Sequence, residues 1–160
     1  MKKVERMLVV DDEASIRDTL SEYFTAVGYE VVAAEDGVDA LRKFIPRRFD
    51  CLITDIVMPG VDGIELLKQI RFLDNDIVCL VITGFPGIGS AISAMKEGAC
   101  DYLTKPFHME DIRLKVEKAL IVRKNEMQLR KVKSLMLTMI ILIPVLISLG
   151  IIFGIFWKGM

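Results

Sequence analysis

Five side chains that carry acid, hydroxyl or amine groups stand directly after short apolar runs of the chain: Asp11, Asp12, Asp55, Thr83 and Lys105. Three carboxylates that lie close together repel one another and raise each other's pKa unless a cation is present. A hard divalent ion with oxygen ligands relieves this repulsion, and Mg²⁺ accepts few carboxylates together with waters and a phosphate group. A single Asp after a strand is most often a turn or helix-cap residue, so the prediction of a Mg²⁺ site rests on the combination.

The elements that would position these side chains are short strands and amphipathic helices. Five apolar runs, mostly of Val, Ile and Leu, are too short for helices and show little alternation, which is typical of strands covered on both faces. The segments between them, such as "ASIRDTLSEYFTAVG", have the spacing of amphipathic helices, and Gly28 and Gly98 are placed to end two of them. The five runs are 7–10, 29–33, 51–54, 77–82 and 102–104.

This alternation predicts an α/β fold. Five strand–helix units joined by short loops imply right-handed crossovers and therefore a doubly wound, five-stranded parallel sheet. Functional groups of such a sheet gather at the carboxyl ends of the strands, which brings the five side chains to one edge. The loop after the first strand, "DDEAS", is acidic, whereas a flavin or nucleotide binder needs a Gly-, Ser- or Thr-rich loop that cradles phosphate there. The acidic loop argues against that class of protein.

Four stretches, "LVVDDE", "LITDIVMPGVDGIELL", "VITG" and "DYLTKPF", together resemble the receiver domain of two-component response regulators. The stretch "SAISAMKEGACDYLTKPF" is especially similar to receivers of the nitrogen-regulation type, and the resemblance covers about residues 4–121 in order and spacing. It implies the flavodoxin-like receiver fold and a signalling function. Such a domain accepts a phosphoryl group, in a Mg²⁺-dependent reaction, from a sensor histidine kinase or a phosphotransfer protein, and then signals to a partner protein.

The resemblance also implies a role for each residue of the site. Phosphorylation would shift the domain between two packings, and the expected readout face is the fourth helix, the fifth strand and the fifth helix. The peptide bond before Pro106 is expected to be cis. The implied roles are phosphoacceptor for Asp55, Mg²⁺ ligands for Asp11, Asp12, Asp55 and the backbone carbonyl of Val57, phosphoryl binding for Thr83 and Lys105, and a switch aromatic for Tyr102.

The chain departs from the resemblance in two places. The loop "GFPGIGSA" carries Pro86, Gly87 and Gly89, and because glycine costs about 1 kcal/mol against alanine in a helix, we expect the fourth helix to start late or to be mobile. Receivers of the nitrogen-regulation type normally precede an ATPase and a DNA-binding domain, but no basic recognition helix, nucleotide loop or second catalytic constellation follows Val122. We therefore expect neither nucleic-acid binding nor an independent enzyme activity, and the downstream protein is unknown.

The C-terminal segment has a different composition. Residues 134–157 contain no charged side chain, and a helix of that length reaches about 36 Å, enough to cross a hydrocarbon core of about 30 Å. Residues 113–133 hold 8 Lys and Arg against 2 Glu, whereas residues 1–112 hold 12 Lys and Arg against 20 Asp and Glu. Positive charge beside a spanning helix favours the cytoplasmic side. These patterns predict a receiver domain over 1–122, a basic juxtamembrane helical stalk over 123–133 and a single transmembrane helix over 134–157.

The expected location is therefore the inner (cytoplasmic) membrane, with one span and with the receiver domain in the cytoplasm. Two uses of the anchor stay open. It either concentrates the receiver near a membrane-bound kinase or target, or it lets phosphorylation change the pairing of tails in a homodimer, since "GIIFG" has a spacing that permits close helix approach. The competing class of protein is a non-phosphorylated receiver-fold scaffold that docks partners at the membrane. The complete set of five site residues argues against it, because a binding-only module would not require all of them.

Overall fold

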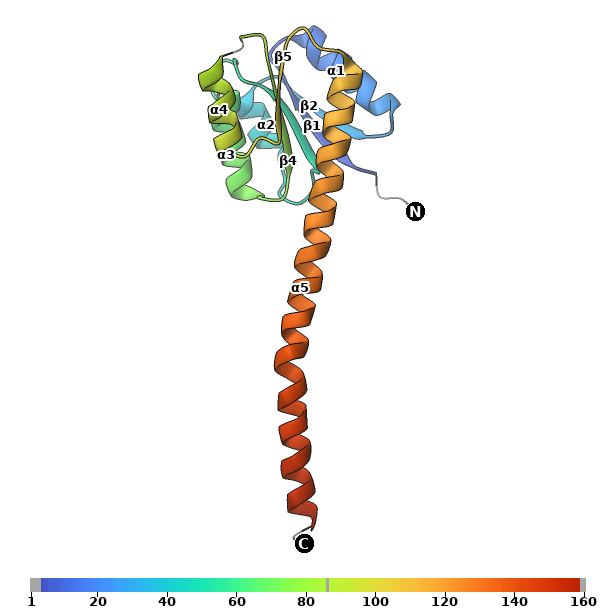
Figure 1. Cartoon of the computed structure of the whole chain (residues 1–160). Helices are drawn as coiled ribbons and strands as arrows, with labels where there is room; N and C mark the ends of the chain where they lie inside the picture. The colour runs from blue at the N-terminus through green and yellow to red at the C-terminus, as the bar shows by residue number, and fades with distance from the viewer. Residues whose placement is uncertain (1–3, 86, 159–160) are drawn as a thin grey trace. The chain divides into compact units, whose positions relative to one another are not determined.

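The computed structural model in Figure 1 describes residues 4–85 and 87–158, without the side chains of residues 148 and 151–158. Five strands alternate with five helices along these residues. The strands are β1 (Arg6–Val10), β2 (Glu30–Ala34), β3 (Cys51–Asp55), β4 (Val78–Thr83) and β5 (Asp101–Thr104). The helices are α1 (Ala14–Ala26), α2 (Gly37–Lys43), α3 (Gly63–Leu73), α4 (Ile88–Lys96) and α5 (Met109–Lys158). All five predicted strands are confirmed to within one residue at each end.

The strands form one parallel sheet in the order β2-β1-β3-β4-β5. Strand β1 lies between β2 and β3, so the chain builds the sheet outward in both directions, as the prediction of a doubly wound sheet requires. The register places Val10 opposite Thr54 and places Asp55 opposite Ile82. The residues that follow β1 and those that end β3 and β4 therefore meet at one edge of the sheet.

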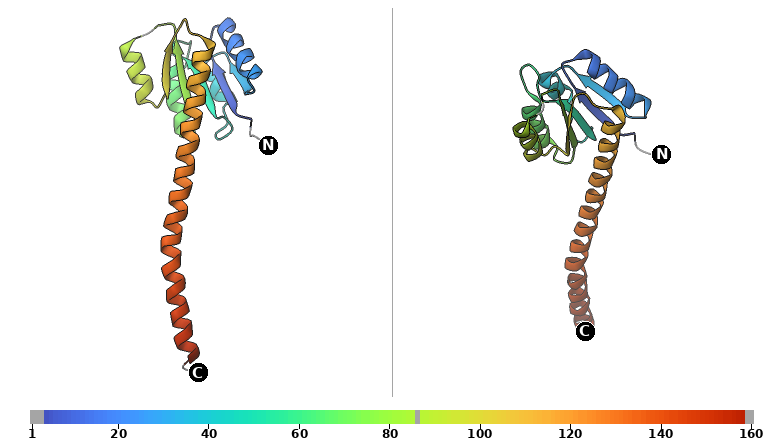
Figure 2. Two further views of the ribbon diagram at one scale, coloured as in Figure 1. Left: turned by 45° about the vertical axis from the view of Figure 1, so that its right-hand side comes forward. Right: turned by 45° about the horizontal axis from the view of Figure 1, so that its top comes forward.

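Helices cover both faces of the sheet. Figure 1 shows α1 and the first turns of α5 on one face and α2, α3 and α4 on the other, and the two views of Figure 2 agree. Alternate residues of β1 enter the two cores, because successive side chains of a strand point to opposite faces. One core contains Met7, Val9, Leu20, Phe24, Ile112 and Val116, and the other contains Leu8, Val10, Leu66, Leu67, Ile70 and Ala94.

Local chemistry sets several helix ends. The Asp36 side chain caps α2 by accepting from the Asp39 amide, and the Asp62 side chain caps α3 by accepting from two amides of its first turn. The glycines predicted to end two helices do so: Gly28 follows α1 with φ 101°, and Gly98 follows α4 with φ 96°. Only a residue without Cβ adopts this left-handed conformation at little cost.

Helix α4 starts at Ile88, so Gly89 lies inside its first turn. The expectation that this helix starts late or is mobile stays a prediction. The N-cap residue Gly87 offers no side chain to the first amides, but the Ser90 hydroxyl donates to the Gly87 carbonyl at 2.8 Å. The Gly87 carbonyl thus accepts from both this hydroxyl and the Ala91 amide, which closes the first turn. Pro86 lies outside the described residues.

Contacts divide the chain into two units, Met1–Ile121 and Val122–Met160, and the helical backbone of α5 runs through the predicted stalk. In the part of the chain whose side chains are described, no helix is both long and apolar enough to cross a bilayer. The transmembrane helix expected over 134–157 is therefore not supported by the structure. The side chains of residues 148 and 151–157 lie outside that description. The uninterrupted part before them, residues 134–147, spans only about 21 Å as a helix.

Candidate functional site

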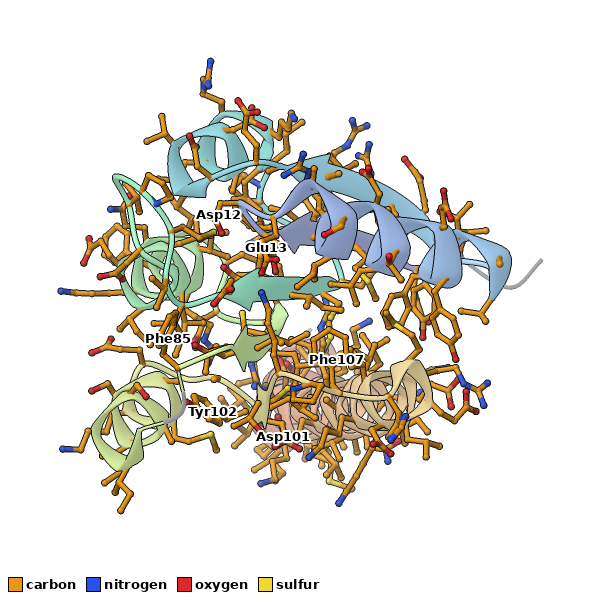
Figure 3. The ribbon with its side chains drawn as sticks, turned by 90° about the horizontal axis from the view of Figure 1, so that it is seen from above. Asp12, Glu13, Phe85, Asp101, Tyr102 and Phe107 are labelled. Carbon is orange, nitrogen blue, oxygen red and sulfur yellow. The ribbon has the colours of Figure 1, made fainter. Side chains whose placement is uncertain are left out.

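The carboxyl ends of the strands carry a cluster of charged side chains. Figure 3 looks down on this edge: Asp12 and Glu13 lie near its middle, and Phe85 and Tyr102 lie on the side of α4. Asp11 follows the last residue of β1, and Asp55 is the last residue of β3. Because these two strands are hydrogen-bonded neighbours, residues far apart in the sequence come together here.

Three carboxylates form the centre of the cluster. One oxygen each of Asp11, Asp12 and Asp55 lies within 4.8 Å of the other two. Asp11 and Asp55 are 2% and 6% exposed, whereas Asp12 is exposed to solvent. Burial raises the pKa of Asp11 above its ordinary value, although the hydrogen bond from Lys105 opposes this effect. Buried carboxylates at this spacing need positive charge nearby to stay ionised together.

Lys105 supplies positive charge to the cluster. Its ammonium nitrogen lies 2.7 Å from Asp55 Oδ2, 2.9 Å from Asp11 Oδ2 and 3.3 Å from Glu13 Oε1. Burial lowers the pKa of Lys105, but the hydrogen bonds to Asp55 and Asp11 outweigh it and hold the pKa above its ordinary value. The Lys105–Pro106 bond is cis, as expected. Lys105 therefore remains an ammonium throughout the physiological pH range.

Main-chain amides orient the buried carboxylates. The Val57 amide donates to Asp55 Oδ1 at 3.1 Å, and the Glu13 amide donates to Asp11 Oδ1 at 2.9 Å. Each carboxyl thus accepts from an amide on one oxygen and from Lys105 on the other. A carboxylate held at both oxygens has one orientation, which is the preorganisation that an in-line reaction at Asp55 requires.

The donor set fits a Mg²⁺ ion. Mg²⁺ binds oxygen ligands through one or two carboxylates, keeps several waters and takes up phosphate oxygens. The three carboxylates provide oxygens close to one another, and the exposure of Asp12 leaves one side of the cluster open to water. Val57, whose carbonyl is the predicted backbone ligand, follows Asp55 by two residues and is 50% exposed. These residues could hold the ion.

Thr83 and Tyr102 lie on the next two strands. Thr83 ends β4 and is fully buried; its hydroxyl oxygen accepts from the Phe85 amide at 3.2 Å, and its carbonyl accepts from the Lys105 amide at 2.8 Å. Tyr102 lies on β5, half-buried, and its hydroxyl is 3.1 Å from the Ser90 hydroxyl. Thr83 thus ends β4 at the edge where Asp55 ends β3, whereas the Tyr102 hydroxyl is directed at α4.

Three residues of this edge were not predicted. Glu13 contacts Lys105, Arg17 binds main-chain carbonyls of the acidic loop, and Ser90 pairs with Tyr102. Glu13 could have been found, because it directly follows the acidic pair in "LVVDDE". The contacts of Arg17 and Ser90 depend on side-chain direction and on the placement of α4 against β5, so residue spacing alone does not reveal them.

The response regulator receiver domain family matches residues 7–117 of the chain. The chain belongs to this family, whose members are signalling modules of two-component systems. This agrees with the five-stranded parallel sheet, and the acidic cluster is consistent with phosphoryl acceptance by an Asp. The similarity supports the family, but not the narrower nitrogen-regulation type that the sequence suggested.

Individual relatives agree with this assignment. Response regulator MprA of Mycobacterium ulcerans is 38% identical over 107 residues, which are 67% of this chain and 46% of that protein. A receiver domain protein from Clostridium thermocellum superimposes with a TM-score of 0.71 at 31% identity, covering 76% of this chain and 98% of that one. TrrA from Thermotoga maritima, crystallised with Mg²⁺ and BeF, gives a TM-score of 0.66 at 37% identity, covering 72% of this chain and 99% of that one. The chain thus spans less than half the length of the curated relatives it matches.

Proposed function

We propose that the chain is a phosphorylation switch in which Asp55 accepts a phosphoryl group from a sensor histidine kinase or a phosphotransfer protein. One observation carries the proposal: the ammonium of Lys105, whose side chain is 13% exposed, bridges Asp55 and Asp11 inside a cluster of three carboxylates. Receiver-family membership supports the same assignment.

The residues of the cluster would divide the chemistry of transfer among them. An Asp55 oxygen attacks phosphorus in line, so that a P–O bond forms while the P–N bond of a donor phosphohistidine breaks and the imidazole keeps the electron pair. Lys105 turns its ammonium from the Asp55 carboxylate to an oxygen of the transferred group. Mg²⁺ bound by Asp11, Asp12, Asp55 and the Val57 carbonyl would offset negative charge on that group.

The acyl phosphate would then act on Thr83 and Tyr102. It adds acceptor oxygens next to β4, and the Thr83 hydroxyl turns toward them and leaves the Phe85 amide. The loop from Phe85 to α4 loses that bond, so Tyr102 and the first turn of α4 repack. This is a shift between two packings caused by a local electrostatic change, and the face made by α4, β5 and the start of α5 would present it to a downstream protein.

A mass measurement tests the proposal. The full-length protein in lipid nanodiscs is incubated with a small-molecule phosphodonor, with and without Mg²⁺. We expect one phosphoryl adduct that depends on Mg²⁺ and is absent in Asp55→Asn. A folded protein that binds Mg²⁺ but forms no adduct would contradict the switch and favour the scaffold that docks partners without phosphorylation.

We further propose that the C-terminal segment attaches the protein to the cytoplasmic face of the inner membrane. Support comes from the sequence, in which residues 134–157 have no charge and follow five basic residues in 123–133. The apolar side chains described from Leu135 to Leu149 are exposed. Alkaline carbonate extraction of cell membranes tests the attachment: we expect the full chain in the pellet and a chain lacking 134–157 in the supernatant. Release of the full chain by carbonate would contradict it.

A further inference from the structure

Arg17 of α1 holds the loop that presents the acidic pair. Its Nη1 donates to the carbonyl oxygen of Asp11 at 2.8 Å and lies 3.5 Å from the carbonyl oxygen of Asp12. Arg17 is half-buried, and its own amide donates to the Glu13 carbonyl at 3.0 Å in the first turn of α1. The guanidinium therefore connects α1 to the main chain of Asp11 and Asp12 in the acidic loop.

The two aspartates depend on this tie to different degrees. The Asp11 carboxylate is fixed independently by the Glu13 amide and by Lys105. The Asp12 side chain is exposed, and the hydrogen bonds and ion pairs seen among the described residues do not include its carboxylate. Among the contacts described, the position of Asp12 therefore depends on the main chain of the loop, which Arg17 holds.

The chemistry of arginine suits this role. Its guanidinium is charged at every physiological pH and presents several donors in a rigid plane, whereas the ammonium of lysine is a single point on a flexible stem. The guanidinium is directed at carbonyl oxygens, so it leaves the carboxylate oxygens available for other ligands.

We propose that Arg17 is a positioning residue for the divalent-cation site, acting through the main chain of Asp11 and Asp12. The inference rests on the proposed function, because the cation is the Mg²⁺ of the phosphoryl-transfer site. Groups that orient metal ligands from outside the coordination shell typically change metal affinity by 10–100-fold when they are removed. We expect the dissociation constant for the cation to rise about tenfold in Arg17→Met.

The test measures cation binding in the unphosphorylated full-length protein in nanodiscs. Free Mn²⁺ is followed by electron paramagnetic resonance, and Mg²⁺ competition gives its dissociation constant. Arg17→Met is compared with Arg17→Lys, which keeps the charge and part of the donor set, and with Arg42→Met. Arg42 is the matched control because its side chain is 70% exposed on α2 and pairs only loosely with Asp39, at 3.8 Å.

The expected result is weaker binding in Arg17→Met, partial recovery in Arg17→Lys and no change in Arg42→Met, with cation-free unfolding temperatures within a few degrees of one another. The rate of Asp55 phosphorylation at saturating Mg²⁺ should stay within about twofold, because only the affinity term changes. Unchanged affinity in Arg17→Met would overturn the inference, as would equal loss in both Arg17 variants together with a large loss of cation-free stability. Absence of cation binding in the unaltered protein would instead overturn the proposed site itself.

Discussion

Val57 lies two residues after Asp55, the proposed phosphoacceptor, at a position where a side chain could influence loss of a phosphoryl group. Its amide orients Asp55, and its side chain is 50% exposed beside it. An apolar side chain offers no hydrogen bond to an attacking water, so we predict slow self-dephosphorylation. Val57→Asn or Val57→Glu should shorten the half-life of the adduct roughly tenfold or more, since positioned polar groups contribute on that order to proton transfer.

The half-life is read by intact mass after the phosphodonor is removed, with Val57→Ala as the control for loss of bulk. Equal half-lives for the Asn, Glu and Ala variants would show that position 57 does not control the water.

Gly63 allows α3 to begin against the backbone of Asp55. A Cβ at this position would overlap the Asp55 carbonyl oxygen, which is main chain and has little room to move. Gly63→Ala should lower the free energy of unfolding by about 1–3 kcal/mol or more, because overpacking forces the backbone to shift. It should also slow phosphorylation, because Asp55 is displaced.

Urea unfolding and the phosphorylation assay together measure this effect. Gly89→Ala in α4 is the matched control, since a Cβ there meets no atom within 4 Å and Gly89 lies inside a helix. We expect that variant to gain roughly 0.5–1 kcal/mol. Equal stability of the two variants would contradict the close approach at Gly63.

At the scale of elements, α4 is linked to the edge strand β5 by hydroxyl groups. The Ser90 hydroxyl donates to the Gly87 carbonyl, so the Tyr102 hydroxyl donates to the Ser90 oxygen. Ser90→Ala removes the closing bond of the first turn and the acceptor of Tyr102. Because one hydrogen bond contributes about 1 kcal/mol net, the Ala91 amide, which donates to the Gly87 carbonyl, should exchange with deuterium roughly fivefold faster.

Hydrogen–deuterium exchange read by mass spectrometry measures this change. Ser93→Ala, at an exposed position of the same helix, is the control and should leave exchange of the first turn unaltered. The link between α4 and Tyr102 would be contradicted if both variants exchanged at the same rate.

The strands could be predicted because each is a short apolar run, and their edge could be predicted because polar residues end or follow β1, β3, β4 and β5. That pattern also placed Asp55 and Lys105 together, since parallel strands bring their carboxyl ends to one edge. Glycine content alone did not determine the start of α4, because Gly89 lies inside its first turn. Arg17 and Ser90 were not predicted, because both act through contacts with the main chain or with a distant strand, which residue spacing does not reveal.

At the scale of the whole molecule, the side chains that form both cores lie between Met7 and Leu120. The unit up to Ile121 therefore contains the sheet, its covering helices and the charged cluster. We predict that a chain ending at Ile121 folds with a urea midpoint close to that of the full chain and forms the Asp55 adduct at the same rate. Circular dichroism and intact mass measure both properties; an unfolded or unreactive truncated chain would show that the remainder of α5 is required.

The sequence patterns and the structure disagree on the C-terminal segment, residues 134–157. Composition predicts a transmembrane helix over 134–157. Among the residues whose side chains are described, no helix is long and apolar enough to cross a membrane. A receiver and its attachment are separable in this account, because phosphoryl acceptance depends only on groups between Asp11 and Lys105. Failure of the membrane proposal would therefore leave the switch intact.

The central claim is that the phosphoryl group resides on the Asp55 carboxylate, and hydroxylamine trapping tests it most directly. Hydroxylamine attacks an acyl phosphate at the carbonyl carbon, releases phosphate and leaves a hydroxamate, whereas phosphate esters of Ser, Thr and Tyr do not react in this way. The full-length protein is phosphorylated with Mg²⁺ present, treated with hydroxylamine, digested and sequenced by mass spectrometry. The account predicts a hydroxamate at Asp55 and none in Asp55→Asn; a modification at any other residue, or none at all in folded protein, would contradict it.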